Sequence, residues 1–252
     1  MTHWLRNKAW LAGAAAAALL AGCTTTADGP APLNASSFAT VVADTSRPDA
    51  DKARDADRLP AAVMAFAGVR PEMKIGELAP GGGYFTRLLS LAVGPAGRVY
   101  AISSRPAPAL EEWAKTHPQV TVKIGPIAAP LAPEPLDMVW TTLNYHDFKN
   151  AKVGDSDNAA VTNKLAFDAL KPGGIYLVSD HEAAAGSGAG ATSTLHRVES
   201  ALVVREVEAA GFKLDGRSDL LRHPADNHTV RVTDGAIRGK TDQFLLRFRK
   251  PG

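Results

Sequence analysis

The chain of 252 residues contains one cysteine, Cys23, so no disulfide can form within it. The formal net charge is only +2, and no block of Lys and Arg follows the first residues. The sequence therefore does not indicate nucleic-acid binding. A composition of 45% hydrophobic and 21% charged residues is typical of a globular chain and excludes a largely disordered one. About 230 residues remain beyond the N-terminal segment, enough for one large domain with a core.

An apolar run long enough to cross a membrane is also missing. Residues 9 to 20 are apolar and follow Arg6 and Lys8, but a bilayer requires about 20 such residues. A basic start, an apolar stretch and small residues before a cleavage site are typical of a signal peptide. The segment "LAGC" resembles the bacterial lipobox, which implies that Cys23 is lipidated and begins the mature protein.

Three N-terminal features follow from this interpretation. We predict a signal peptide over residues 1–22 and a flexible tether over residues 23–48, which are rich in small and polar residues. The resemblance implies that acyl chains on Cys23 hold the protein stably at a membrane of the bacterial cell envelope. Thr24 after the cysteine fits transfer to the outer membrane, where the protein would face the periplasm.

From Asp49 onward, short apolar strands alternate with helical stretches. The predicted strands are Met73 to Leu78, Arg98 to Ser103, Val120 to Ile124, Leu136 to Thr142 and Gly174 to Asp180. The predicted helices between them are Tyr84 to Val93, Ala107 to Thr116 and Asn158 to Leu170. This alternation predicts βαβ crossovers and a parallel sheet. After a further helix that ends at Gly211, residues 213–221 and 242–249 are predicted to pair as an antiparallel hairpin at the sheet edge.

A glycine-rich loop joins the first predicted strand to its helix in "IGELAPGGGYFTRLL", residues 75–89. Glycines let a backbone approach a ligand closely, and the start of the next helix presents free N–H groups. The alternative is a tight turn that binds nothing.

Two polar clusters follow the fourth and fifth predicted strands. They are "NYHD", residues 144–147, and "SDHE", residues 179–182. Ligands of open parallel sheets lie beyond the carboxyl ends of the strands. We therefore predict that His146 and His181 face one cavity above the glycine loop and act in catalysis with Asp147 and Asp180. A histidine beside a carboxylate can serve as a general base, or the same residues can ligate a metal, although we assign none.

Two alternatives to this site remain. His146 and Asp147 can simply cap a loop, and His181 can be an exposed side chain without a role. A third histidine, His196 in "LHR", can reach the same rim or merely begin its helix.

Five segments in order resemble the motifs of class I methyltransferases that use S-adenosylmethionine. They are "IGELAPGGGYFTRLL", "RVYAISSRP", "PLDMVW", "LKPGGIYLVSD" and "VEAAGF". With "NYHD" and "LHR", the chain is most similar to a group of predicted bacterial methyltransferases. The resemblance implies a Rossmann-like α/β domain over residues 49–252. Its sheet would have seven strands, mostly parallel with an antiparallel last strand, and helices on both faces.

The same resemblance implies S-adenosylmethionine as the cofactor, with the glycine loop beneath its methionine part. The implied cofactor-binding residues are Glu77, Ala79, Gly81, Gly83, Ser103 and Asn144. Three positions depart from the family pattern. Ser103 stands where an acid usually holds the ribose, Pro126 stands near the usual place of an acid beside the adenine, and Ala79 replaces the first glycine.

The sequence thus predicts a methyltransferase that acts on a small molecule. Charged S-adenosylmethionine is made in the cytosol and does not cross membranes unaided, so an envelope location leaves three possibilities: the leader is misread, a supply route exists, or the fold serves another task. In the last case, the chain would be a non-catalytic lipoprotein that keeps the scaffold as a binding module. A metal-dependent enzyme built on the two histidine clusters is the third reading.

Overall fold

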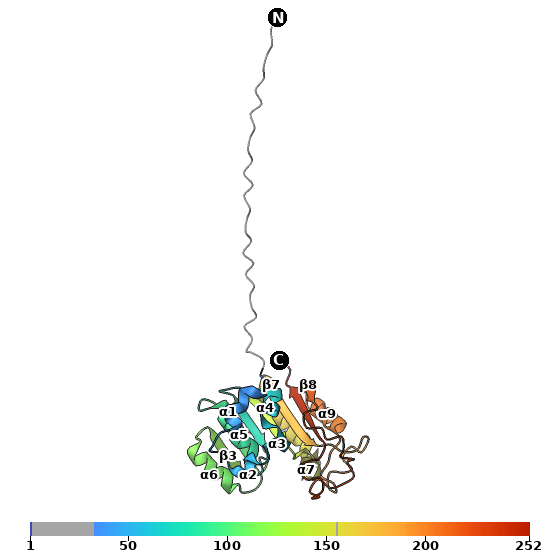
Figure 1. Cartoon of the computed structure of the whole chain (residues 1–252). Helices are drawn as coiled ribbons and strands as arrows, with labels where there is room; N and C mark the ends of the chain where they lie inside the picture. The colour runs from blue at the N-terminus through green and yellow to red at the C-terminus, as the bar shows by residue number, and fades with distance from the viewer. Residues whose placement is uncertain (2–32, 155) are drawn as a thin grey trace. The chain divides into compact units, whose positions relative to one another are not determined.

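A computed structural model describes Met1, residues 33–154 and residues 156–252. The predicted signal peptide, Cys23 and the first part of the predicted tether lie outside these residues. Seven strands form one sheet in the order β3-β2-β1-β4-β7-β9-β8 (Figure 1). Their bounds are β1 (Lys74–Leu78), β2 (Arg98–Ser103), β3 (Val120–Ile124), β4 (Leu136–Thr142), β7 (Leu170–His181), β8 (Lys213–Ser218) and β9 (Gln243–Arg249).

Only β9 runs against its neighbours in this sheet, since β1, β2, β3, β4 and β7 pair in parallel and β9 pairs antiparallel with both β7 and β8. The predicted α/β fold, mostly parallel with an antiparallel last strand, is confirmed. The predicted hairpin also forms, but β9 enters the sheet and leaves β8 at the edge. A separate short ribbon pairs β5 (Lys152–Val153) with β6 (Ser156–Asp157).

Helices cover both faces of the sheet. Before β1 lie η1 (Ala35–Phe38), α1 (Ala39–Val42), α2 (Asp49–Lys52), α3 (Asp55–Arg58) and α4 (Pro60–Ala67). After β1 come α5 (Tyr84–Val93), α6 (Pro108–Thr116), α7 (Tyr145–Asn150), α8 (Asn158–Ala169) and α9 (Ser200–Ala209). Pro60 begins α4, where a missing N–H costs nothing. None of the helices in the described ranges is long and apolar enough to span a membrane.

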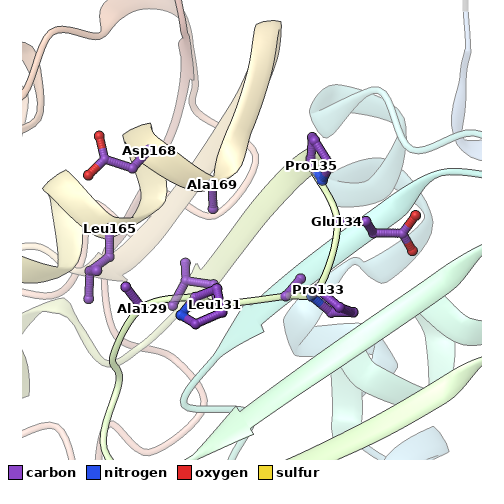
Figure 2. Close-up of a pocket in the computed structure, with 10 residues that line it drawn as sticks. Ala129, Leu131, Pro133, Glu134, Pro135, Leu165, Asp168 and Ala169 are labelled. Carbon is purple, nitrogen blue, oxygen red and sulfur yellow. The ribbon is translucent and has the colours of Figure 1, made fainter.

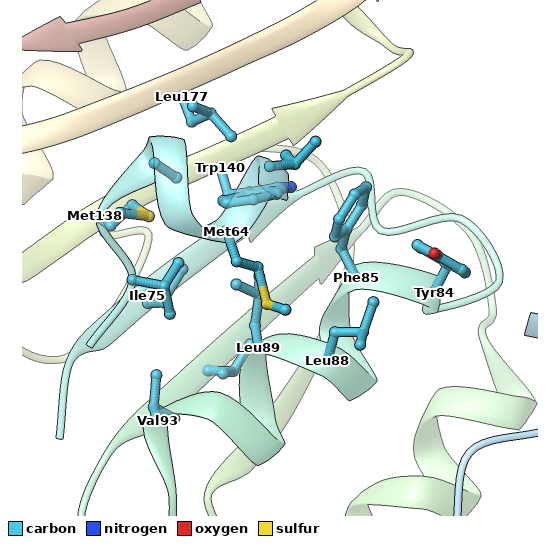
Figure 3. Close-up of a cluster of buried hydrophobic side chains, with 14 of the residues drawn as sticks. Met64, Ile75, Tyr84, Phe85, Leu88, Leu89, Val93, Met138, Trp140 and Leu177 are labelled. Carbon is cyan, nitrogen blue, oxygen red and sulfur yellow. The ribbon is translucent and has the colours of Figure 1, made fainter. Parts of the chain in front are cut away.

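The core has two halves because side chains alternate along each strand. On one face, Met138 and Trp140 of β4 pack with side chains of α4 and α5 (Figure 3). Trp113 of α6 belongs to the same cluster. On the other face, Val139 packs with side chains of α7, α8 and α9. Both faces are therefore buried, as in other parallel sheets flanked by helices.

The compact domain begins earlier than the sequence predicted. Residues 33 to 252 form one unit, whereas the predicted boundary lay at residue 49. Phe38 is 5% exposed and belongs to the core, and the buried guanidinium of Arg47 is 2.7 Å from the carboxylate of Asp55. Residues 33–48 of the predicted tether are thus part of the domain.

A hollow of about 300 Å³ lies between residues 129–135 and the end of α8 (Figure 2). Its walls are mostly apolar, with Leu131, Pro133 and Ala169 among them. Residues 129–135 precede β4, and α8 ends where β7 begins. This hollow therefore lies at the amino ends of the strands, opposite the glycine loop, and contains none of the predicted site residues.

Candidate functional site

In the loop between β1 and α5, two positions require glycine for different structural reasons. Both adopt the left-handed backbone conformation, with φ of +57° at Gly81 and +84° at Gly83. A Cβ on Gly81 would meet nothing within 4 Å, whereas a Cβ on Gly83 would lie 2.1 Å from Cδ2 of Leu110. Gly81 thus leaves open space for a ligand. Gly83 is required by packing against Leu110 of α6.

Two adjoining cavities lie at the carboxyl ends of β1, β2 and β4. Their volumes are about 230 and 940 Å³, and both are lined by Ala79, Gly81 and Asn144. Glu77 lines the smaller cavity, and Ser103 lines the larger one. Five of the six predicted cofactor-binding residues therefore line these two cavities, and the larger one has a volume that small-molecule sites commonly have.

Charged groups concentrate in the smaller cavity. Glu77 is 2% exposed, and its carboxylate accepts a hydrogen bond from the Thr86 hydroxyl. Burial raises the pKa of Glu77 to about 7. Arg54 and Arg58 line the same cavity, and burial lowers the pKa of Arg58 to about 10. A buried carboxyl group and two guanidinium groups thus share one small space.

Helices α2 and α3 contribute a wall that the sequence did not reveal. Asp51, Arg54 and Arg58 line the smaller cavity and belong to "DADKARDADR", residues 49–58, in which no binding motif is recognised. Nε of Arg87 donates to Asp51, and Nη2 of Arg87 donates to the Gly82 carbonyl, each over 2.7 Å. Arg87 therefore ties this wall to the glycine loop, a contact between distant segments that no local motif records.

Asn144 connects the cofactor side to the histidine side of the site. Its side-chain nitrogen, Nδ2, donates to the backbone carbonyl of Ala79 over 2.9 Å and to that of Thr142 over 2.7 Å. The preceding residue, Leu143, has φ of 59°, an unusual conformation for a branched side chain. Asn144 therefore holds the glycine loop against the sharp turn from which α7 starts.

The two predicted polar clusters meet at the neighbouring ends of β4 and β7. Asp180 is fully buried and accepts hydrogen bonds from Nδ1 of His146 over 2.8 Å, from the His146 amide over 2.7 Å and from the His181 amide over 2.8 Å. The rings of His146 and His181 have centroids 6.2 Å apart. Of the four predicted catalytic residues, only Asp147 lines the large cavity; the two histidines line neither of the two cavities.

His196 reaches this cluster. Its Nδ1 lies 3.2 Å from Nε2 of His146, and its Nε2 accepts a hydrogen bond of 2.7 Å from Nη2 of Arg231. His196 has φ of 56° in a left-handed conformation that costs about 1–2 kcal/mol for a residue other than glycine. Such strained residues concentrate at functional sites. The sequence left open whether His196 reaches the rim, and the structure places it there.

The two predicted catalytic histidines differ in basicity. Burial opposes the charged form of His146, but its hydrogen bond with Asp180 and the charges of Asp180 and Asp147 outweigh this and raise its pKa above the usual value. Burial lowers the pKa of His181 to about 4. The Nδ1 of His181 is 2.8 Å from the Thr241 hydroxyl. His181 is thus a poor proton acceptor at neutral pH, contrary to the sequence-based expectation.

Comparison with known proteins identifies the fold. No protein-family model and no curated protein matches the chain. The cyclase SpnF is similar at a TM-score of 0.58 and 17% identity, over 78% of this chain and 81% of its own. An S-adenosylmethionine-dependent methyltransferase from Aquifex aeolicus is similar at a TM-score of 0.54 and 17% sequence identity. The match covers 81% of this chain and 98% of that protein.

A third similar structure is an arsenic(III) S-adenosylmethionine methyltransferase from Chlamydomonas reinhardtii. It has a TM-score of 0.55 and 17% identity, over 88% of this chain and 75% of its own. At these identities the likeness shows the fold alone, and the fold is that of class I S-adenosylmethionine-dependent methyltransferases. SpnF, described as a cyclase, illustrates that one fold carries more than one reaction.

Proposed function

We propose that this protein binds S-adenosylmethionine and transfers its methyl group to a small molecule. One observation carries the proposal: five residues that the methyltransferase motifs assign to the cofactor line one pair of adjoining cavities. They come from segments up to 67 residues apart, Glu77 to Asn144, and only the fold brings them together.

The charges of the smaller cavity suit the methionine part of the cofactor. Arg54 and Arg58 offer guanidinium groups to its carboxylate. Glu77 offers a carboxylate to its ammonium group. The larger cavity offers the Ser103 hydroxyl to the ribose and apolar walls, Pro126 and Ile127 among them, to the adenine.

The reaction would proceed by direct attack of an acceptor nitrogen or oxygen on the methyl carbon. The new bond forms as the carbon–sulfur bond breaks, and its electron pair stays on sulfur as S-adenosylhomocysteine. The acceptor would then lose one proton to the Asp147 carboxylate at the cavity wall or to solvent. Asp147 lines the large cavity and lies 3.5 Å from Nε2 of His146, so the acceptor would enter beside this polar cluster.

Calorimetric titration with S-adenosylmethionine tests the proposal. In Gly81→Val, side-chain atoms would occupy the space beside the loop, and binding should be lost. Gly68→Val is the matched control, because Gly68 also has a left-handed backbone, with φ of +82°, has nothing within 4 Å of its Cβ position, and lines neither cavity. Both variants carry a similar backbone cost, about 1–2 kcal/mol. Equal effects of the two substitutions on affinity would contradict the proposed cavity.

A binding module without catalysis is the second candidate. Ser103 supports it, because a neutral hydroxyl holds a ribose less firmly than the carboxylate usual in the family, by on the order of 1 kcal/mol. Absence of heat with wild-type protein at millimolar cofactor would favour this second function.

The location remains part of the proposal. Residues 19–23, "LLAGC", support lipidation of Cys23 and attachment to an envelope membrane, most simply the outer membrane on its periplasmic side. A methyltransferase there would need a route that supplies S-adenosylmethionine.

A further inference from the structure

His146, Asp147 and His196 direct three potential ligand atoms at one point. Nε2 of His146 and Nδ1 of His196 are 3.2 Å apart. Oδ1 of Asp147 lies 3.5 Å from the first and 3.7 Å from the second. Two imidazole nitrogens and one carboxylate oxygen are a common ligand set for divalent transition metals.

These separations have the size that a metal requires. A tetrahedral Zn²⁺ with ligand distances of about 2.0–2.1 Å holds its ligand atoms about 3.3–3.4 Å apart. From these contacts the geometry points to a divalent metal site formed by His146, Asp147 and His196, which goes beyond the proposed methyl transfer and does not depend on it.

Asp180 prepares His146 for this role. The Nδ1–H of His146 donates to the buried Asp180 carboxylate, so the lone pair of Nε2 points toward His196 and Asp147. Metal-bound histidines in proteins usually donate their other N–H to such a carboxylate, which fixes the tautomer and orients the ring. The metal site also explains the strained backbone of His196, because this conformation brings Nδ1 of His196 close to Nε2 of His146.

Arg231 opposes the metal. A guanidinium group only donates, so Nε2 of His196 accepts from Arg231 and the proton of the neutral ring resides on Nδ1. This Nδ1–H is then placed to donate to Nε2 of His146, 3.2 Å away. When the metal binds, the proton moves from Nδ1 to Nε2 of His196 and Arg231 withdraws. Arg231 is exposed, so water readily replaces this contact.

The site leaves one coordination position open. Three protein ligands in a tetrahedral site leave the fourth to water or to a substrate oxygen, as catalytic zinc sites do. Asp147 belongs to both the ligand set and the wall of the large cavity, so this position adjoins the space where an acceptor would enter. Mg²⁺ prefers oxygen ligands and fits a site with two imidazoles poorly.

Titration of the untagged, chelator-treated full chain with Zn²⁺, without S-adenosylmethionine, tests the site. We expect one Zn²⁺ per chain and no comparable binding of Mg²⁺. His196→Ala and Asp147→Asn should each weaken Zn²⁺ binding at least tenfold, on the scale of such changes around metals. His223→Ala, which alters a histidine outside the cluster, should leave the affinity unchanged. Co²⁺ should show the absorption spectrum of a tetrahedral site with nitrogen and oxygen ligands.

Arg231→Ala gives the sharpest prediction, because it removes a side chain far along the chain from either motif. It should tighten Zn²⁺ binding severalfold, whereas loss of a merely structural contact would not. Lack of stoichiometric Zn²⁺ in wild type and in Arg231→Ala, or full affinity in His196→Ala, would overturn the site and leave a hydrogen-bonded histidine pair. Calorimetric titration of the metal-free chain with S-adenosylmethionine measures cofactor binding by itself. Failure of the metal site can therefore be distinguished from failure of the proposed function.

Discussion

Glu77→Gln should stabilise the protein at alkaline pH, because Glu77 is buried without a partner that compensates its charge fully. Its carboxyl group is 2% exposed and accepts one side-chain hydrogen bond, from Thr86. Gln keeps the size of the side chain and an oxygen that accepts the same hydrogen bond, and it removes the ionisation. The perturbation therefore isolates the cost of a buried negative charge.

The sign and size follow from the pKa of Glu77, which burial raises from 4.5 to about 7. Below pH 4.5 both folded and unfolded states hold the proton, and the group contributes nothing. Between pH 4.5 and 7 the folded state binds more protons, so stability falls as pH rises. Above pH 7 the full cost stands, about 3 kcal/mol at about 1.4 kcal/mol per pKa unit.

Urea unfolding of wild type and Glu77→Gln between pH 4.5 and 8 measures this difference. The variant should be about equal in stability to wild type at the lower end and more stable by about 3 kcal/mol at pH 8. Subtracting the two curves removes the titration of all other groups. A difference that stays constant with pH would refute the reasoning about Glu77.

Three further predictions concern the loop, the ribose position and the N-terminus. Gly83→Val should lower the melting temperature strongly, with about 1–3 kcal/mol from overpacking alone, whereas Gly82→Val, whose Cβ would meet nothing within 4 Å, should not. Ser103→Asp should tighten S-adenosylmethionine binding severalfold in calorimetry, and Ser104→Asp, on the same cavity wall, should do so less. Cys23→Ala should leave the protein uncleaved or soluble in cell fractionation; wild type in the cytosolic fraction with an intact N-terminus would contradict lipidation.

The sequence predicted the strands well because their signals are local. β2, β3 and β4 have the predicted bounds, since each is a short apolar run bounded by turn residues. The convergence of "NYHD" and "SDHE" was predictable too, because consecutive parallel strands of such a sheet end at one edge. The five cavity residues followed from the motifs of a known family.

The remaining parts of the site depend on contacts between segments that no pattern links. Arg58 lines the cavity because α3 packs over Tyr84, with its guanidinium carbon 4.6 Å from the ring centre. Nothing in the sequence around His181 indicates how strongly burial lowers the pKa of this side chain. The sequence placed Gly83 at the cofactor, but only the approach of Leu110 reveals that packing requires this glycine.

The stretch from Thr142 to His146 positions both halves of the site. Thr142 pairs with Ser179 at the ends of β4 and β7, and the Leu143 amide donates to the Ser179 carbonyl over 2.8 Å. This register sets Asp180 level with the start of α7, where it accepts from the His146 amide. Asn144, between these contacts, holds the glycine loop. A shift of this turn would therefore disturb the cofactor cavity and the histidine cluster together, so the two sites are coupled through the backbone even where their ligands do not touch.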